Sequence, residues 1–276
     1  MIYTKISVLI KTGEDVPFFI GSQIRGAFGY ALKKVTCINP SYQCKDCFAK
    51  DNCLYWEFYE QKNRPLKYRL DFKLARPYYD FDIYLFADAT KKLPYVISAL
   101  HMMVSKNGLG KDRKTYQNFD IYINDKHINK NHKIEIPKES IKTFQIDKIH
   151  QDIKLQFLTP LRMKKHNQFI RKEELELKDL VNSIYQRQMQ LIGQKPKKFP
   201  YEIEGKIVKK DLNFKELTRM SNRQKTTMNM GGLMGEIEIT GMNDKAFHVL
   251  KLGELIGVGK QTVFGLGKIK VEGLDE

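Results

Sequence analysis

The 276-residue sequence contains no apolar run that approaches the roughly 20 residues of a membrane-spanning helix. Its first ten residues alternate around Lys5 and lack the basic, apolar and small-residue order of a signal peptide. We therefore expect a cytoplasmic protein with no membrane partner. Hydrophobic residues make up 42% of the chain, which is enough for the core of one large domain or two small ones.

A nucleotide-binding glycine motif is also missing, although residues 257–268 hold four glycines and two lysines. Gln261 follows Gly259-Lys260 and Ile269 follows Gly267-Lys268, so no window fits G-x-x-x-x-G-K-[ST]. Thr262 stands where G-x-G-x-x-G requires its third glycine. We expect this glycine-rich loop to offer backbone N–H groups and Lys260 to phosphates. An ordinary turn between a helix and an edge strand is the alternative.

Acidic residues are scarce. The chain has 48 Lys and Arg against 32 Asp and Glu, a net charge of +16. Three windows contain no acid at all, namely residues 153–172, 218–235 and 255–271. This distribution favours a polyanionic partner, usually nucleic acid, over a merely solvated basic surface.

The hydrophobic pattern repeats in two halves, each in the order β-α-β-β-α-β. The first half predicts strands over 3–11, 68–74, 81–85 and 119–123 and helices over 20–34 and 92–106. The second predicts strands over 152–159, 212–219, 233–240 and 268–272, the first ended by Pro160, and helices over 173–191 and 243–256. A Gly-x-Gly-Lys element precedes the last strand of each half. We predict an α+β fold with two tandem ferredoxin-like (βαββαβ, RRM-like) domains, residues 1–149 and 150–276.

All four cysteines fall within one short segment, residues 36–57, which we interpret as an insertion in the first domain. They are Cys37, Cys44, Cys47 and Cys53. The spacing favours a structural zinc ion over a catalytic one, since four thiolates leave no open position. Reduced cysteines packed in a small satellite core and an iron–sulfur cluster remain alternatives.

Several segments resemble one known family. They are residues 21–32 (GSQIRGAFGYAL), the cysteines with Tyr55 and Phe58, residues 157–164 (FLTPLRMK), residues 221–225 and 232–236, and the glycine-rich loop. Together they resemble the CRISPR-associated RAMP superfamily, and within it the endoribonucleases (the sixth Cas family) that cut precursor CRISPR RNA at its repeats. The resemblance implies metal-independent cleavage, in which the ribose 2′-OH attacks the adjacent phosphate. It also implies 2′,3′-cyclic phosphate and 5′-OH ends, and a guide RNA that is often retained.

Such cleavage needs a base, an acid and cations at the phosphate. Many relatives place a histidine near the first helix, but this chain has none in its first 100 residues. We therefore expect Tyr30, Lys33 and Lys34 to border the scissile phosphate, with His166 as a further candidate. Each has a structural alternative: packing for Tyr30 and helix C-capping for the two lysines.

Residues expected to bind RNA combine cations with the glycines of the loop. They are Arg25, Arg162, Lys164, Lys165, Arg187, Arg223, Lys225, Gly257, Gly259, Lys260, Gly265 and Gly267. The expected partners are CRISPR repeat RNA, mature guide RNA and other CRISPR effector subunits. Two other functions stay open: a non-catalytic RAMP subunit that holds guide RNA in an effector complex, and a zinc-bearing RNA-binding module unrelated to CRISPR.

Overall fold

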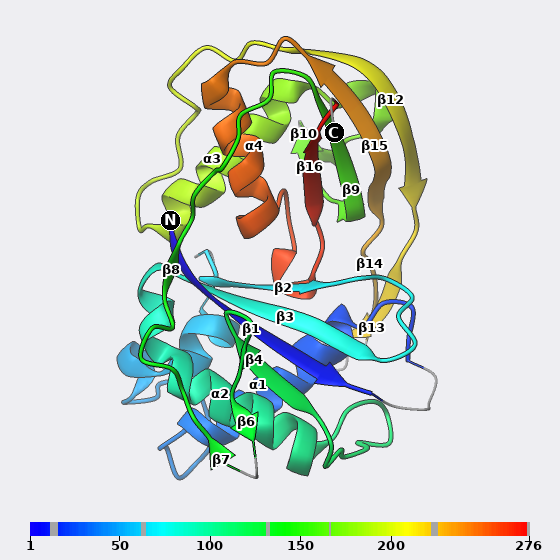
Figure 1. Ribbon diagram of the computed structural model, residues 1–276. Helices are drawn as coiled ribbons and strands as arrows, with labels where there is room; N and C mark the ends of the chain where they lie inside the picture. Colours follow the sequence, from blue (N-terminus) through cyan, green and yellow to red (C-terminus); the bar gives the residue numbers. More distant parts are fainter. Residues whose placement is uncertain (12–15, 62–64, 131–132, 166, 222–225, 275–276) are drawn as a thin grey trace. The chain divides into compact units, whose positions relative to one another are not determined.

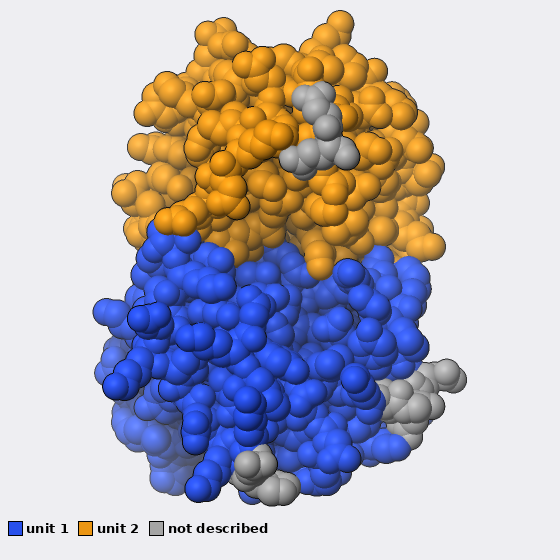
Figure 2. All heavy atoms as spheres, in the orientation of Figure 1, with its two compact units in different colours: residues 1–143 blue, residues 144–276 orange. Residues whose placement is uncertain are grey.

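The computed structural model describes residues 1–276 except 12–15, 62–64, 131–132, 166, 222–225 and 275–276. The described chain divides into two compact units, residues 1–143 and 144–276 (Figure 2). The sequence predicted a boundary six residues later, between 149 and 150. Within the described part, no helix is both long enough and apolar enough to cross a membrane.

Unit 1 is a ferredoxin-like fold, as predicted. Its sheet has the order β2-β3-β1-β4-β5, and α1 and α2 lie together on one face (Figure 1). The main elements are β1 (Ile2–Ile10), α1 (Gly21–Thr36), β2 (Tyr68–Phe72), β3 (Tyr79–Phe86), α2 (Leu93–Met102) and β4 (Asp120–Ile123). Alternation explains β1, since Ile6, Val8 and Ile10 are fully buried while intervening residues are half-exposed. A π-helical turn, Met103–Asn107, extends α2.

Short strands that the sequence did not predict follow β4 in unit 1. They are β5 (Lys126–His127), β6 (Asn129–Lys130), β7 (Lys133–Ile134) and β8 (Lys142–Thr143), of which β8 pairs with the start of β1. A strand of two residues is too short to show an alternation of hydrophobic and polar residues in the sequence. The segment 37–67 between α1 and β2 contains a 3-10 helix, Lys50–Asn52, and a π-helix, Trp56–Glu60.

Unit 2 repeats the same topology. Its sheet has the order β12-β15-β9-β16, and α3 and α4 pack against each other (Figure 1). The elements are β9 (Ile153–Leu161), β10 (Lys164–Lys165), β11 (Gln168–Phe169), α3 (Leu177–Leu191), β12 (Lys206–Lys215), β13 (Thr218–Ser221), β14 (Thr226–Asn229), β15 (Gly232–Thr240), α4 (Asp244–Ile256) and β16 (Ile269–Gly273). Two 3-10 helices, Lys172–Glu174 and Thr262–Phe264, complete the unit.

Pro160 does not end its strand, contrary to the prediction. The register between β9 and β15 shifts between the pairs Gly235–Phe157 and Leu233–Leu161, so Pro160 lies in a bulge. A bulged position needs no ladder N–H, which is the group that proline lacks. The Pro160 carbonyl oxygen instead accepts a hydrogen bond from the Gly267 N–H, at 3.0 Å. The bulge therefore connects the first strand of the unit to the glycine-rich loop.

Candidate RNA-binding and catalytic surfaces

Tyr30 and Lys34, two of the predicted catalytic residues, form a cationic cluster on α1 of unit 1. Tyr30 is 47% exposed. The Lys34 ammonium lies 4.7 Å from the centre of the Tyr30 ring, and the Arg113 guanidinium carbon lies 5.5 Å from the same ring. Lys34 also donates a hydrogen bond of 3.2 Å to Asn107 Oδ1. One accessible phenol thus has two cations at its ring.

The loop 108–114 places Arg113 in this cluster. Gly108 has a φ of +76°, and a Cβ there would overlap the Arg113 carbonyl. Leu109 and Lys114 exchange backbone hydrogen bonds of 2.8 and 2.9 Å, which close the loop. Arg113 was not predicted as a site residue. The repeated Gly-x-Gly-Lys element was the signal for the loop, but nothing in it indicated which cation would reach α1.

Lys33 lies beside the cysteine segment. Its ammonium is 5.2 Å from the ring centres of both Tyr42 and Tyr55. Burial raises the pKa of the Cys44 thiol, and the nearby Lys33 opposes this shift. Lys33 therefore contacts a different set of groups from Lys34, although the two are adjacent in sequence.

The predicted zinc site is not supported. In the part of the chain that the structure describes, which includes all four cysteines, no three Cys, His, Asp or Glu side chains are grouped to hold a metal ion. The four cysteines are free thiols of intermediate exposure. Thiolates can ligate one ion only when they converge on it, and the described cysteines form no such group.

Arg25, predicted to bind RNA, lies half-buried on α1. Its guanidinium carbon is 4.7 Å from the centre of the Tyr59 ring, and the Tyr59 hydroxyl donates a 2.7 Å hydrogen bond to the Arg25 carbonyl oxygen. These contacts attach the segment after the cysteines to α1.

Six of the predicted RNA-binding residues line one groove in unit 2. The groove has a volume of about 380 Å³ and is lined by Arg162, Lys164, Lys165, Arg187, Gly259 and Lys260, together with polar residues of one face of α3. The lining also includes one acidic residue, Asp179. The arrangement brings together cations from the residue after β9, the β10–β11 hairpin, α3 and the glycine-rich loop, which suits a phosphate backbone.

The cations of the groove differ in burial and in their hydrogen bonds to the rest of the protein. Arg162 is only 7% exposed; its Nη1 donates a 2.8 Å hydrogen bond to the Gly231 carbonyl oxygen, and its guanidinium carbon lies 4.1 Å from the Phe169 ring centre. Burial lowers the pKa of Arg162. Lys260, by contrast, is exposed. Arg162 therefore shapes the groove, and Lys260 presents its charge to solvent.

Lys165 is held by two carboxylates. Its ammonium lies 3.0 Å from Glu176 Oε1 and 3.5 Å from Asp179 Oδ2. Hydrogen bonds from Lys178 and then Lys165 lower the pKa of Glu176 to about 2. At Lys165 the positive charge of the groove is therefore already paired with carboxylates of the protein.

The glycine-rich loop is largely buried, and the N–H groups of its four glycines are bonded within the protein. Gly257, Gly265 and Gly267 are buried. The backbone donors pair as follows: Gly257 with Gly253 O, Val258 with Gly267 O, Gly259 with Ser183 Oγ, Lys260 with Arg162 O, Gly265 with Thr262 O, Gly267 with Pro160 O and Lys268 with Thr159 Oγ1. These groups are not presented to a phosphate, contrary to the prediction. The glycines permit positive φ and close backbone approach, of Gly259 to Arg162 and of Gly267 to Val258.

On the exposed face of the sheet in unit 2, lysines and glutamates form ion pairs with one another. Lys154 lies 3.5 Å from Glu236, and Lys209 lies 2.8 Å from Glu238; Lys270 pairs with Glu272. This face differs from the groove, where cations predominate. Three predicted residues, His166, Arg223 and Lys225, lie outside the described residues.

Comparisons with known proteins agree over both units. Residues 1–143 match the N-terminal domain family AF_1859_N, and residues 155–269 match the CRISPR-associated endoribonuclease Cas6 family. An uncharacterized protein of Archaeoglobus fulgidus is 25% identical over 283 residues, covering 93% of this chain and 92% of its own length.

Two solved structures share the fold over the full chain. A Cas6 product complex has a TM-score of 0.57 at 15% identity, covering 99% of this chain and 100% of that one. An RAMP protein binding different RNA substrates has a TM-score of 0.51 at 11% identity, with the same coverage. The family match and the shared fold confirm the resemblance read from the sequence. The chain therefore belongs to the family defined by the AF_1859_N N-terminal domain, and its second unit matches the model of the CRISPR-associated endoribonuclease Cas6.

Proposed function

We propose that this protein binds CRISPR repeat RNA and cleaves it without a metal ion. The 2′-oxygen attacks the adjacent phosphorus, the bond from phosphorus to the 5′-oxygen breaks, and the proton lost from the 2′-OH is balanced by one delivered to the 5′-oxygen. The products carry a 2′,3′-cyclic phosphate and a 5′-OH. The observation that carries this proposal is the cluster of Tyr30, Lys34 and Arg113.

The cluster offers the groups that this reaction needs. Lys34 and Arg113 bring positive charge to the place where the phosphorane becomes more negative than the starting phosphate. Tyr30 carries an accessible hydroxyl that is both a donor and an acceptor, and so can exchange a proton with the 2′- or 5′-oxygen. Lys33, held near Tyr42 and Tyr55, contributes charge beside the site rather than at it.

We further propose that the cleaved guide RNA stays bound through the groove of unit 2. Lys164, Arg187 and Lys260 line that groove, and multiple phosphate contacts slow dissociation at moderate salt. A retained product allows one turnover per protein, which makes a slow chemical step sufficient.

The test is a single-turnover assay of the full chain on a labelled repeat hairpin, with chelator present. We expect cleavage with a cyclic-phosphate end, and a rate loss of about 100-fold for Lys34→Gln and for Arg113→Gln. Tyr30→Phe is expected to slow cleavage while leaving RNA affinity unchanged. Tyr95→Phe, at a tyrosine of unit 1 that is 50% exposed, serves as the matched control.

Two outcomes would overturn parts of the proposal. Wild-type rates in the Tyr30, Lys34 and Arg113 variants would remove the cluster from the chemistry. Tight repeat binding with no cleavage in any wild-type preparation would favour the non-catalytic RAMP subunit instead.

A further inference from the structure

The connection between α3 and β12, residues 192–205, forms a surface that the proposed site does not include. It runs for 14 residues without secondary structure, a length that is uncommon in compact domains unless the loop is functional. Residues 192–201 contain no acid and include Lys195, Lys197 and Lys198, all exposed. None of the three acid-free windows covers this segment.

Aromatic rings follow one another along this connection. The Tyr185 and Phe199 ring centres are 5.2 Å apart, and those of Phe199 and Tyr201 are 5.5 Å apart. The Lys245 ammonium lies 3.7 Å from the Tyr201 ring centre. Tyr201 is 54% exposed. We call Tyr185, Phe199, Tyr201 and the exposed lysines the aromatic–lysine surface.

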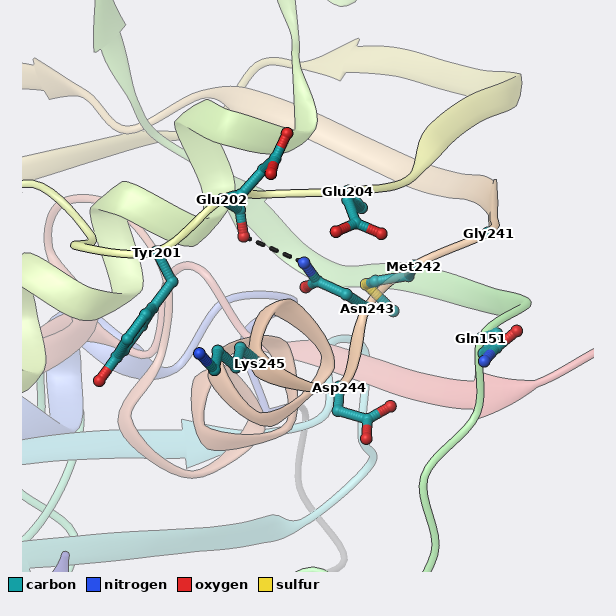
Figure 3. A pocket seen from close by; sticks show the side chains of 9 residues that line it. All are labelled: Gln151, Tyr201, Glu202, Glu204, Gly241, Met242, Asn243, Asp244 and Lys245. Carbon is teal, nitrogen blue, oxygen red and sulfur yellow. Dashed lines mark hydrogen bonds between the residues drawn. The ribbon is translucent and has the colours of Figure 1, made fainter.

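This surface is held in place and adjoins the groove. Asn182, which lines the groove, accepts a 2.8 Å hydrogen bond from the Phe199 N–H through its Oδ1. At the other end, Asn243 Nδ2 donates a 3.0 Å hydrogen bond to the Glu202 carbonyl oxygen (Figure 3). One residue of α3 thus contacts both the groove and the connection, so a strand leaving the groove over α3 meets Phe199 next.

A pocket of about 490 Å³ ends the surface at Tyr201. Figure 3 shows Tyr201 and Lys245 together at one side of it, and three carboxylates, those of Glu202, Glu204 and Asp244, line the rest. Carboxylates repel phosphates, whereas the lysines before Tyr201 attract them. A nucleic-acid strand would therefore place its phosphates along residues 195–198 and a base at Tyr201.

We propose that the aromatic–lysine surface binds single-stranded RNA that flanks the repeat hairpin. Stacking on aromatic rings beside a basic track is how proteins hold unpaired nucleotides without reading their sequence. A duplex hides its bases, so the exposed rings favour the unpaired flank over the hairpin itself. This inference rests on the proposed RNA-binding function but not on cleavage.

The test compares binding of two RNAs to the full chain: the repeat hairpin alone, and the same hairpin with an unpaired flank on either side. We expect Tyr201→Ala to lower the affinity for the flanked RNA by about tenfold and to leave the affinity for the bare hairpin unchanged. Tyr201→Phe should restore binding, because the ring is retained. Tyr95→Ala removes a similarly exposed tyrosine from the other unit and should change neither affinity.

A second experiment measures how the lysines contribute to the salt dependence of binding. The double variant Lys197→Gln/Lys198→Gln is expected to reduce the slope of log affinity against log salt by about 1.4 for the flanked RNA only. Equal affinities of wild type and Tyr201→Ala for flanked RNA, or equal losses on both RNAs, would overturn the proposal. A wild type that binds but does not cleave refutes the nuclease function and leaves this comparison valid.

Discussion

Replacing Gly267 by alanine separates a packing role of the glycine-rich loop from a role in gripping RNA. Gly267 has a φ of +69°, and a Cβ there would overlap the Val258 carbonyl oxygen, which is backbone and cannot swing away. The left-handed conformation costs an L-residue about 1–2 kcal/mol. Relief of the overlap would break two hydrogen bonds, from Val258 N–H to Gly267 and from Gly267 N–H to Pro160. Each is worth about 0.5–1.5 kcal/mol.

We therefore expect Gly267→Ala to lower the free energy of unfolding of unit 2 by about 2–5 kcal/mol. The matched control is Gly193→Ala in the same unit, where φ is +80° but a new Cβ has no atom within 4 Å. It should lose only the conformational part, about 1–2 kcal/mol. Because the single tryptophan, Trp56, lies in unit 1, hydrogen exchange of β9 and β16 peptides in urea is the suitable measurement.

RNA binding completes the comparison. Under conditions where Gly267→Ala is still folded, its affinity for repeat RNA should stay close to that of the wild type, whereas Lys260→Gln should weaken binding without loss of stability. If Gly267→Ala unfolds no more readily than Gly193→Ala and yet loses RNA affinity, the packing argument is refuted and the N–H groups act on RNA after all.

Three further predictions concern other residues. Glu176→Gln removes the nearer of the two carboxylates that hold Lys165, so it should tighten RNA binding and steepen its salt dependence by up to about 0.7, measured by a salt titration; an unchanged slope would show that Lys165 is not available to RNA. Burial, and to a lesser extent Lys106, lower the pKa of His101, so the unfolded chain binds more protons than the folded chain just below pH 6.5. The free energy of unfolding should therefore fall as the pH falls through that window. His101→Gln should remove this pH dependence from the urea midpoint measured as a function of pH. Arg162→Lys loses the planar contact with Phe169 and the bond to Gly231, and should destabilise unit 2 by about 1–3 kcal/mol in thermal unfolding, more than Lys164→Arg does.

The sequence predicted those elements whose side chains keep a strict period. Alternation of Ile6, Val8 and Ile10 located β1, and the apolar stripe of Ile24, Phe28 and Leu32 located α1. The start of β12 was missed, because Lys206–Lys210 is an exposed edge segment whose strand character comes from backbone pairing with β15 and not from buried side chains. Periodicity reports burial, so it cannot reveal a strand that buries little.

The candidate site was predictable where residues of one sign cluster in sequence. The window 153–172 led to Arg162, Lys164 and Lys165, which do line one groove. Arg113 could not be found in this way, because a left-handed φ of +51° and a closed loop decide where its side chain goes. The glycine-rich loop was misread because composition does not say whether a backbone N–H already has an acceptor.

Both units carry a long connection at the same topological position, between the first helix and the second strand: residues 37–67 in unit 1 and 192–205 in unit 2. Among the residues that the structure describes, no strand of either central sheet lies in these connections. Their length and composition are therefore uncoupled from strand register. Each ferredoxin-like core can accept a foreign segment there, which makes this position the natural graft point for chimeras that exchange RNA preference while leaving the folding of the sheets intact.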